Sequence, residues 1–306
     1  MENPDSAGDI AKTQPRSIWI RVWHFPLVVL VVATAIIVGT AFVSAAVGQE
    51  LIAPNFGENT AIIMGALLLV TLTFLVYKIG VVPLGAKKHD DLPVNRAALR
   101  DTVLGFTGGA ALISLCVGLA ALAGVYTISG PGGFTDWAFI LFVTGLYAGF
   151  FEELLLRGII FRWLEEFAGS WIALAISALV FGFGHAGNDN ATLFSSLAIA
   201  IEAGILLGAA YMLTRSLWLA IGLHAGWNVV QALWGVPVSG NPVDGLVRAE
   251  LEGPPLLAGG GFGLEATIFA LVVATSAGVW MLWKAQKAGR VVSPMWSRKE
   301  AGITSY

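Results

Sequence analysis

Residues 25–47 read FPLVVLVVATAIIVGTAFVSAAV, a run of 23 residues without a charged side chain. A helix that crosses the hydrocarbon core of a bilayer needs roughly 20 predominantly apolar residues. This run is also about twice as long as the apolar core of a usual signal peptide. The stretch therefore predicts a transmembrane helix that stays in the protein, and it sets the fold class for the rest of the chain.

Seven further apolar stretches follow the first. Their approximate limits are 60–77, 102–127, 137–152, 171–187, 191–214, 216–234 and 266–283. The fourth is interrupted by Glu152, but the apolar pattern continues beyond it toward Glu165 and Glu166. We therefore predict an all-α polytopic membrane protein with eight transmembrane helices.

Composition supports this class and excludes others. Of the 306 residues, 57% are hydrophobic and only 12% are charged, whereas soluble domains usually carry about 25% charged residues. So few charges cannot cover the surface of a water-soluble enzyme of this size. A net charge of −3 without a basic patch argues against nucleic acid as a partner. The lone cysteine, Cys116, excludes an intramolecular disulfide framework.

The basic residues predict the orientation. Of the 17 Lys and Arg residues, all but Arg248 fall on alternate segments that share one side of the membrane. By the positive-inside rule this side is cytoplasmic, and both termini lie on it. We expect a cytoplasmic tail over 1–21 that is disordered, a membrane domain over 22–286 and a cytoplasmic C-terminal tail over 287–306. The loop 235–263 is rich in Pro and Gly, and we expect it to be extracytoplasmic and without regular structure.

Ionisable residues inside apolar spans are costly and usually functional. This chain has six, accompanied by one amide: Glu152, Glu153, Arg157, His185, Glu202, His224 and Asn228. Glu153 and Arg157 are four residues apart on a helix and can form an ion pair. Glu152 points about 100° away from Glu153 and has no such partner nearby in the sequence. A carboxylate in that setting is suited to act as a general base.

Depth in the membrane brings several of these residues together. At 1.5 Å per residue, Glu152 and His185 lie about 20 Å and 21 Å from the cytoplasmic ends of their helices, and Asn228 about 19 Å. His224 is four residues before Asn228 and shares its helix face. These four residues are the candidate catalytic set. Glu202 is a supporting partner, a gate residue or a packing feature, and the neighbouring Gly204 and Gly208 permit close helix packing.

Metal dependence stays open at this point. The chain has no His-Glu-x-x-His motif and no cysteine cluster. Glu152, His185 and His224 are the candidate ligands for zinc or another divalent metal. Equally, Glu152 with a histidine could activate water without a metal.

Taken together, three motifs resemble the CPBP family of intramembrane proteases, which includes CAAX prenyl protease 2 and bacteriocin-processing homologues. The motifs are Glu152-Glu153-x-x-x-Arg157, Phe181-x-x-x-His185 and His224-x-x-x-Asn228, and the resemblance covers about residues 136–235. It implies an eight-helix fold and peptide hydrolysis in a cavity open to the cytoplasmic side. By position, it implies that Glu152 activates water with help from His185. His224 and Asn228 would bind the oxyanion, and Glu153 and Arg157 would order the site.

The leading hypothesis is therefore an intramembrane endopeptidase of the cell membrane, acting on a CAAX-type or related membrane-associated peptide. One alternative is a non-catalytic scaffold or immunity protein that keeps the fold, with the same residues as a structural network. A less favoured alternative is an ion-coupled transporter, suggested by Glu202 but disfavoured because no inverted repeat is evident. The expected partners are membrane lipid and a peptide or membrane-anchored protein substrate.

Overall fold

The computed structural model describes residues 17–86 and 89–298 and is predominantly helical. Within these residues, seven helical segments are long and apolar enough to cross a membrane. They are Pro26–Ile52, Glu58–Val81, Arg96–Leu122, Phe139–Ala168, Ser170–Gly187, Leu193–Thr214 and Ile268–Lys287. The predicted all-α polytopic membrane fold is confirmed at this level.

Each of these segments contains one α-helix. The α-helices are α1 (Ile18–Trp23), α2 (Pro26–Val47), α3 (Glu58–Val76), α4 (Arg96–Leu122), α5 (Arg162–Ala168), α6 (Ser170–Gly184), α7 (Leu193–Thr214), α8 (Trp218–Leu233), α9 (Pro255–Ala258) and α10 (Ile268–Lys287). Wider, π-type turns form η1 (Gly48–Ile52), η2 (Tyr77–Val81), η3 (Phe139–Glu152) and η4 (Leu154–Phe161). Short 3₁₀ turns form η5 (His185–Gly187), η6 (Gly260–Phe262), η7 (Leu264–Ala266) and η8 (Met295–Ser297).

The fourth predicted span is one continuous helical run. It comprises η3, η4 and α5 and ends at Ala168, so Glu152 is followed by about four further helical turns. The prediction that this helix continues to Glu165 and Glu166 is confirmed. Glu152 therefore lies in the middle of the helix rather than at its end.

The seventh predicted span corresponds to α8, which is shorter than each of the seven apolar segments given above. Its 16 residues extend about 24 Å, compared with about 30 Å for the hydrocarbon core. Most of its side chains are buried within the bundle. A helix enclosed by protein does not have to match the thickness of the lipid, which explains why α8 differs from its neighbours.

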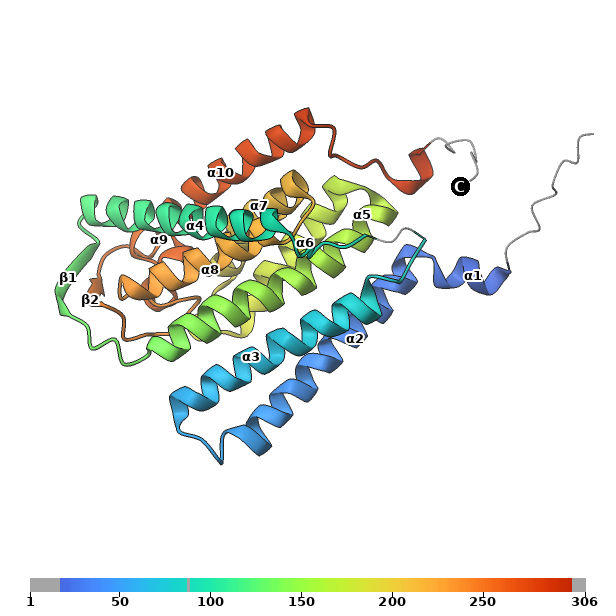
Figure 1. Ribbon diagram of the computed structural model, residues 1–306. Helices are drawn as coiled ribbons and strands as arrows, with labels where there is room; N and C mark the ends of the chain where they lie inside the picture. Colours follow the sequence, from blue (N-terminus) through green and yellow to red (C-terminus); the bar gives the residue numbers. More distant parts are fainter. Residues whose placement is uncertain (1–16, 87–88, 299–306) are drawn as a thin grey trace, which may run out of the picture.

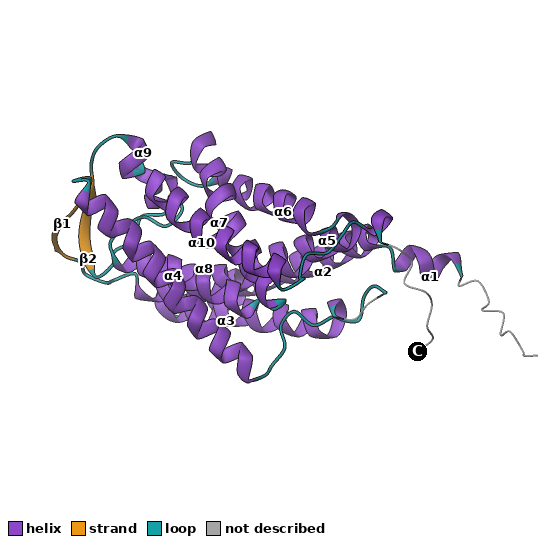
Figure 2. Cartoon of the chain, turned by 90° about the horizontal axis from the view of Figure 1, so that it is seen from above, coloured by secondary structure: helices purple, strands orange, loops and turns teal. Residues whose placement is uncertain are grey.

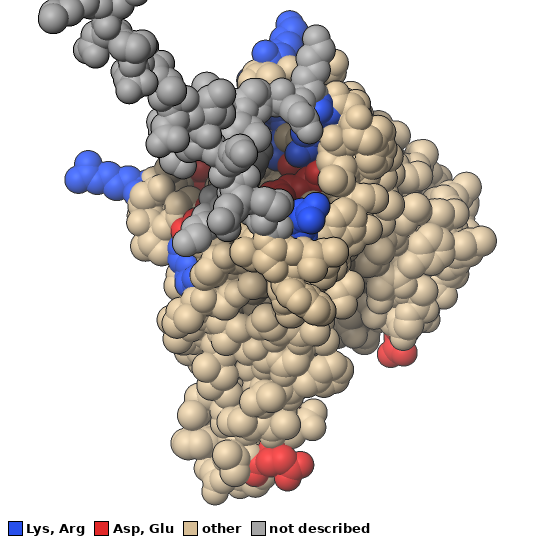
Figure 3. Space-filling view, turned by 90° about the vertical axis from the view of Figure 1, so that its right-hand side faces the viewer, with Lys and Arg blue, Asp and Glu red and all other residues tan. Residues whose placement is uncertain are grey.

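Opposite ends of the bundle differ in character. The two strands β1 (Tyr126–Pro131) and β2 (Val247–Leu251) pair antiparallel at one end, and α1 and α5 lie at the other (Figures 1 and 2). At the α1 and α5 end, charged side chains gather around a hollow (Figure 3). This hollow is a cavity of about 550 Å³ whose lining includes Arg162, Glu165, Glu166, Arg215 and Arg298.

Two of the expected irregular segments contain regular structure. The loop 235–263 was expected to lack it, but β2, α9 and η6 lie within it. The reason is that β2 finds a partner in β1, more than 100 residues earlier, which local sequence does not reveal. In the predicted N-terminal tail 1–21, α1 already begins at Ile18, and residues 1–16 lie outside the described part.

Glycines bring α4 and α8 into backbone contact. A Cβ added at Gly109 would lie 2.2 Å from the carbonyl oxygen of Leu223, and one at Gly226 would lie 2.1 Å from that of Phe106. Gly105 and Gly222 are equally close to the opposite helix. Small residues permit this approach between membrane helices. Because Leu223 precedes His224, the glycine contact sets the position of the helix that carries two candidate site residues.

Gly204 and Gly208 of α7 serve the same purpose against α6. A Cβ at Gly204 would lie 2.6 Å from the Cβ of Ala178, and one at Gly208 would lie 2.5 Å from a methyl group of Leu174. The predicted close helix packing at these two positions is confirmed. Gly204 lies two residues after Glu202 on the same helix.

A buried carboxylate, Asp91, anchors the loop between α3 and α4. Its oxygens accept hydrogen bonds from the hydroxyls of Tyr77 (2.9 Å) and Tyr211 (2.8 Å) and pair with Arg162 (3.0 Å). The Asp91 carbonyl accepts from the backbone N–H of Leu217, immediately before α8. The loop is thereby fixed to three helices and to the start of α8.

Candidate active site

Glu153, Arg157 and His224 form a buried chain of polar contacts. Glu153 Oε1 accepts a hydrogen bond from an Arg157 guanidinium nitrogen at 2.9 Å and lies 2.9 Å from His224 Nδ1. Glu153 and Arg157 are fully buried. The predicted ion pair between them is confirmed, and it extends to a histidine 71 residues away.

Arg157 connects this chain to a third helix. Its second guanidinium nitrogen donates to the backbone carbonyls of Ala203 and Gly204, both at 3.3 Å. Its guanidinium also lies over the ring of Phe181, 4.7 Å from the centroid. Charged groups inside a protein persist when they are paired and hydrogen-bonded. These contacts satisfy that condition for the two terminal nitrogens of Arg157, whereas its buried Nε has no hydrogen-bond partner in the described part of the chain.

Glu152 lies on the other side of the His224 ring. Its Oε2 is 3.9 Å from His224 Nε2, and its side chain is 28% exposed. Oε2 itself is buried and has no hydrogen-bond partner in the described part of the chain. The two adjacent glutamates therefore flank one imidazole, with Glu153 holding Nδ1 and Glu152 facing Nε2.

Phe181 separates the two histidines. Its ring packs edge-on against His185 (centroids 4.9 Å apart) and against His224 (5.7 Å). His185 Nδ1 lies 2.8 Å from the Phe181 carbonyl oxygen, and Nε2 does not take part in this contact. Phe181 therefore contacts Arg157, His185 and His224 at once, and this aromatic residue orders the site, although it was named above only as part of a motif.

Asn228 is anchored to the helix that carries Glu152. Its amide nitrogen donates to the backbone carbonyl of Thr144 in η3 at 3.0 Å. One of the two amide hydrogens is used by this bond. Asn228 and His224 lie on the same face of α8, as predicted from their spacing, and both are buried.

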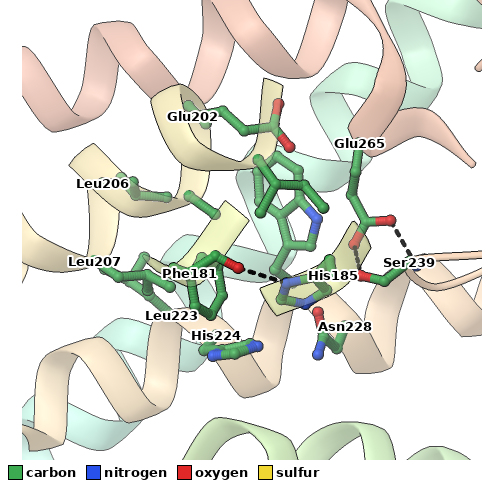
Figure 4. Close-up of a pocket in the computed structure, with 14 residues that line it drawn as sticks. Phe181, His185, Glu202, Leu206, Leu207, Leu223, His224, Asn228, Ser239 and Glu265 are labelled. Carbon is green, nitrogen blue, oxygen red and sulfur yellow. Dashed lines mark hydrogen bonds between the residues drawn. The ribbon is translucent and has the colours of Figure 1, made fainter. Parts of the chain in front are cut away.

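A small cavity adjoins these residues (Figure 4). It has about 30 Å³ of space that water can occupy, enough for about two molecules. His185, His224, Asn228 and Glu202 all contribute to its wall. Glu152 is not among the lining residues; it approaches the cavity from the far side of His224. The candidate residues thus lie on two sides of His224. His185 and Asn228 line the cavity with it, and Glu152 faces its Nε2.

Two further wall residues with polar side chains, Glu265 and Ser239, were not among the predicted site residues. Glu265, in η7, is buried, and it accepts hydrogen bonds from Gln231 Nε2 (2.9 Å) and from the backbone N–H of Ser239 (2.7 Å). The Ser239 hydroxyl lies 3.1 Å from its other oxygen. Glu265 stands next to the apolar stretch 266–283, so an acidic residue at the edge of a span was the available signal. Burial raises the pKa of the Glu265 carboxyl.

The candidate metal ligands do not assemble into a metal-binding group. Among residues 17–86 and 89–298, no three His, Cys, Asp or Glu side chains come close enough to share an ion. His185 contacts the Phe181 carbonyl, and Glu152 and His224 face each other across 3.9 Å. Glu152 and His224 therefore lack, in the described part of the chain, the third side chain that a His/Glu metal site would need.

These features define a polytopic membrane protein with a buried carboxylate, histidine and amide site. Residues 134–230, about a third of the chain, match the family described as type II CAAX prenyl endopeptidase, Rce1-like. The match confirms the resemblance predicted from the three motifs and supports a CPBP-family intramembrane protease, a CAAX-type endopeptidase in general. It includes Glu152, His185, Glu202, His224 and Asn228 but ends before Glu265. Neither the curated proteins nor the solved structures compared with the chain gave a match.

Proposed function

We propose that this protein hydrolyses a peptide bond with a water molecule activated by Glu152. One observation carries the proposal: the buried contacts from Arg157 through Glu153 to His224, which place the imidazole against Glu152. Such a chain fixes the orientation of the ring, as hydrogen-bonded partners do in other acid–base sites. The family match supports the same reaction class.

In this proposal Glu152 is the general base. The 3.9 Å between Glu152 Oε2 and His224 Nε2 lets one water molecule hydrogen-bond to both atoms once a turn of the part-exposed Glu152 side chain opens its buried Oε2 to water. Glu152 takes a proton from the water as its oxygen attacks the peptide carbonyl carbon. When the tetrahedral intermediate collapses, the C–N bond breaks and Glu152 returns the proton to the leaving amine.

His224 and Asn228 are proposed to stabilise the oxyanion, His224 through an N–H at Nε2, because its Nδ1 is engaged by Glu153. Both lie on the same face of α8, and the amide of Asn228 keeps one hydrogen free of its bond to Thr144. Donors held in place before the reaction stabilise developing charge without reorganisation. His185 assists through Nε2, since its Nδ1 is held by the Phe181 carbonyl. Glu153 and Arg157 position His224.

The proposed substrate is a CAAX-type or related membrane-associated peptide that enters from the cytoplasmic side. We also propose eight membrane helices, with α8 as the one enclosed by the others, and a location in the cell membrane. The distribution of basic residues supports cytoplasmic termini. The described elements nearest the termini, α1 and η8, lie at the same end of the bundle (Figure 1), which agrees with that orientation.

The test uses purified protein in detergent and two synthetic peptides, one prenylated at a CAAX cysteine and one unmodified. Cleavage is followed by mass spectrometry for the wild type, Glu152→Ala and the control Glu50→Ala, which removes an exposed carboxylate in η1. We expect cleavage of at least one peptide by the wild type and the control only. Equal cleavage by Glu152→Ala would contradict the assignment. If Glu152→Ala and His185→Ala fold and leave the cellular phenotype intact, the scaffold hypothesis is favoured instead.

A further inference from the structure

Two buried carboxyl groups line the cavity in addition to the proposed catalytic residues. Glu202 on α7 is 1% exposed and Glu265 in η7 is 5% exposed. Glu202 Oε2 has no hydrogen-bond partner among the described residues. Figure 4 shows both carboxyl groups on the same side of the cavity, across from His224. Neither is needed for the hydrolysis described above.

The cavity wall offers these two carboxyl groups the imidazoles of His185 and His224 but, among the described residues, no permanently charged partner. Within residues 17–86 and 89–298, no Lys or Arg lines the cavity. Arg157, the nearest guanidinium along the chain of contacts, is already held by Glu153 and by two backbone carbonyls. Burying a carboxylate without a partner costs several kcal/mol. A bound cation would remove that cost.

Glu265 is held in place to accept such a cation. Gln231 Nε2 and the Ser239 backbone N–H both donate to one of its oxygens, and the Ser239 hydroxyl contacts the other. These bonds fix the carboxyl group at the wall of the cavity. Glu202, by contrast, has an oxygen with no protein partner. One fixed acceptor and one acceptor without a protein partner together form a pair of oxygens that a cation can bind.

The size and lining of the cavity select the type of cation. About 30 Å³ of the cavity is open to the centre of a water-sized group, which limits the charged end of a ligand to a compact group. An ammonium group is of that size, whereas a planar guanidinium is larger. The rest of the wall is mostly aliphatic and includes Ile199, Leu206, Leu207 and Leu223. An aliphatic stem that ends in an ammonium group matches such a wall.

We propose that Glu202 and Glu265 form a subsite that binds the ammonium group of a lysine side chain in the substrate. The inference rests on the proposed function, since it places a substrate residue beside the site of hydrolysis. The two residues that would determine this specificity lie outside the three motifs, and Glu265 also lies outside the region matched to the family.

The first test measures binding without catalysis. Butylammonium reproduces the lysine side chain, and n-butanol is the uncharged control of the same length. Thermal unfolding of the full chain in detergent is followed with each probe for the wild type, Glu202→Gln, Glu265→Gln and Glu250→Gln. Glu250 is an exposed carboxylate in β2 and provides the matched control.

We expect butylammonium to stabilise the wild type and Glu250→Gln more than n-butanol does. In Glu202→Gln and Glu265→Gln the half-saturating concentration should rise at least about tenfold, the value of one charged hydrogen bond. Equal responses to the two probes, or an unchanged response in both Gln variants, would overturn the proposal. Glutamine keeps the shape of glutamate, so the variants retain the packing around the site.

The second test compares peptide pairs in which one position carries either lysine or norleucine. At one position relative to the cleaved bond, the ratio of cleavage rates should favour lysine by about tenfold or more in the wild type, and it should fall toward one in Glu202→Gln. Cleavage that depends on Glu152 but not on lysine, without a butylammonium response, would refute the subsite alone. A butylammonium response that depends on Glu202 without any cleavage would refute the proposed function and leave an amine-binding site.

Discussion

The contact between α4 and α8 offers a sharp test of how the site is positioned. In Gly109→Ala the new Cβ would lie 2.2 Å from the Leu223 carbonyl oxygen, whereas an ordinary contact needs at least 3.4 Å. The two helices must therefore separate by about 1 Å at this point. Overpacking of this kind costs about 1–3 kcal/mol. It also moves His224, the next residue, and a displacement of about 1 Å can lower a catalytic rate by up to about 100-fold.

The matched control lies on the same helix. A Cβ added at Gly118 of α4 meets no other atom within 4 Å, so Gly118→Ala should leave stability unchanged or raise it by up to about 1 kcal/mol through helix propensity. Both variants are compared with the wild type by thermal unfolding in detergent and by peptide cleavage. Equal stability and equal activity of Gly109→Ala and Gly118→Ala would refute the inferred helix contact.

Three further predictions concern charge, the oxyanion and pH. Glu153→Gln should lower the free energy of unfolding by about 3–5 kcal/mol, because the buried Arg157 loses its carboxylate; unfolding in mixed micelles tests this, and Glu250→Gln should show no such loss. Asn228→Ala should lower kcat by about 10²–10³-fold if its amide binds the oxyanion; an unchanged kcat in a folded variant would contradict that role. The hydrogen bond with Asp91 raises the pKa of His89 above its usual value of about 6.5. Stability from protonated His89 is therefore present below that value and lost as pH rises through the raised pKa, by at most about 1 kcal/mol at this half-exposed site. His89→Gln should remove this dependence from a pH series of unfolding measurements, and its persistence would contradict the assignment.

Local patterns in the sequence predicted the features that depend on one helix at a time. The pairing of Glu153 with Arg157 and the shared face of His224 and Asn228 follow from helical spacing, and the structure contains both. The continuation of the helix past Glu152 follows from the apolar pattern. The family resemblance rested on the same local motifs.

Features that depend on contacts between distant segments could not be predicted in this way. His224 pairs with Glu153, 71 residues away, and Glu265 is held by Ser239 from a loop that seemed irregular. The depth argument placed Glu152 level with His185, but a depth does not say which side of a helix faces a cavity. The depth argument therefore could not predict that the histidine beside Glu152 is His224 rather than His185.

The most direct test of the central claim follows the water oxygen. Peptide cleavage by the purified protein in H₂¹⁸O should place one ¹⁸O in the new carboxyl group, and Glu152→Gln should lower the rate of its appearance by at least about 100-fold, the lower end of the range for a general base. Glu50→Gln, which changes an exposed carboxylate, should retain the wild-type rate. Incorporation of ¹⁸O by Glu152→Gln at the wild-type rate would contradict the proposal that Glu152 activates the water.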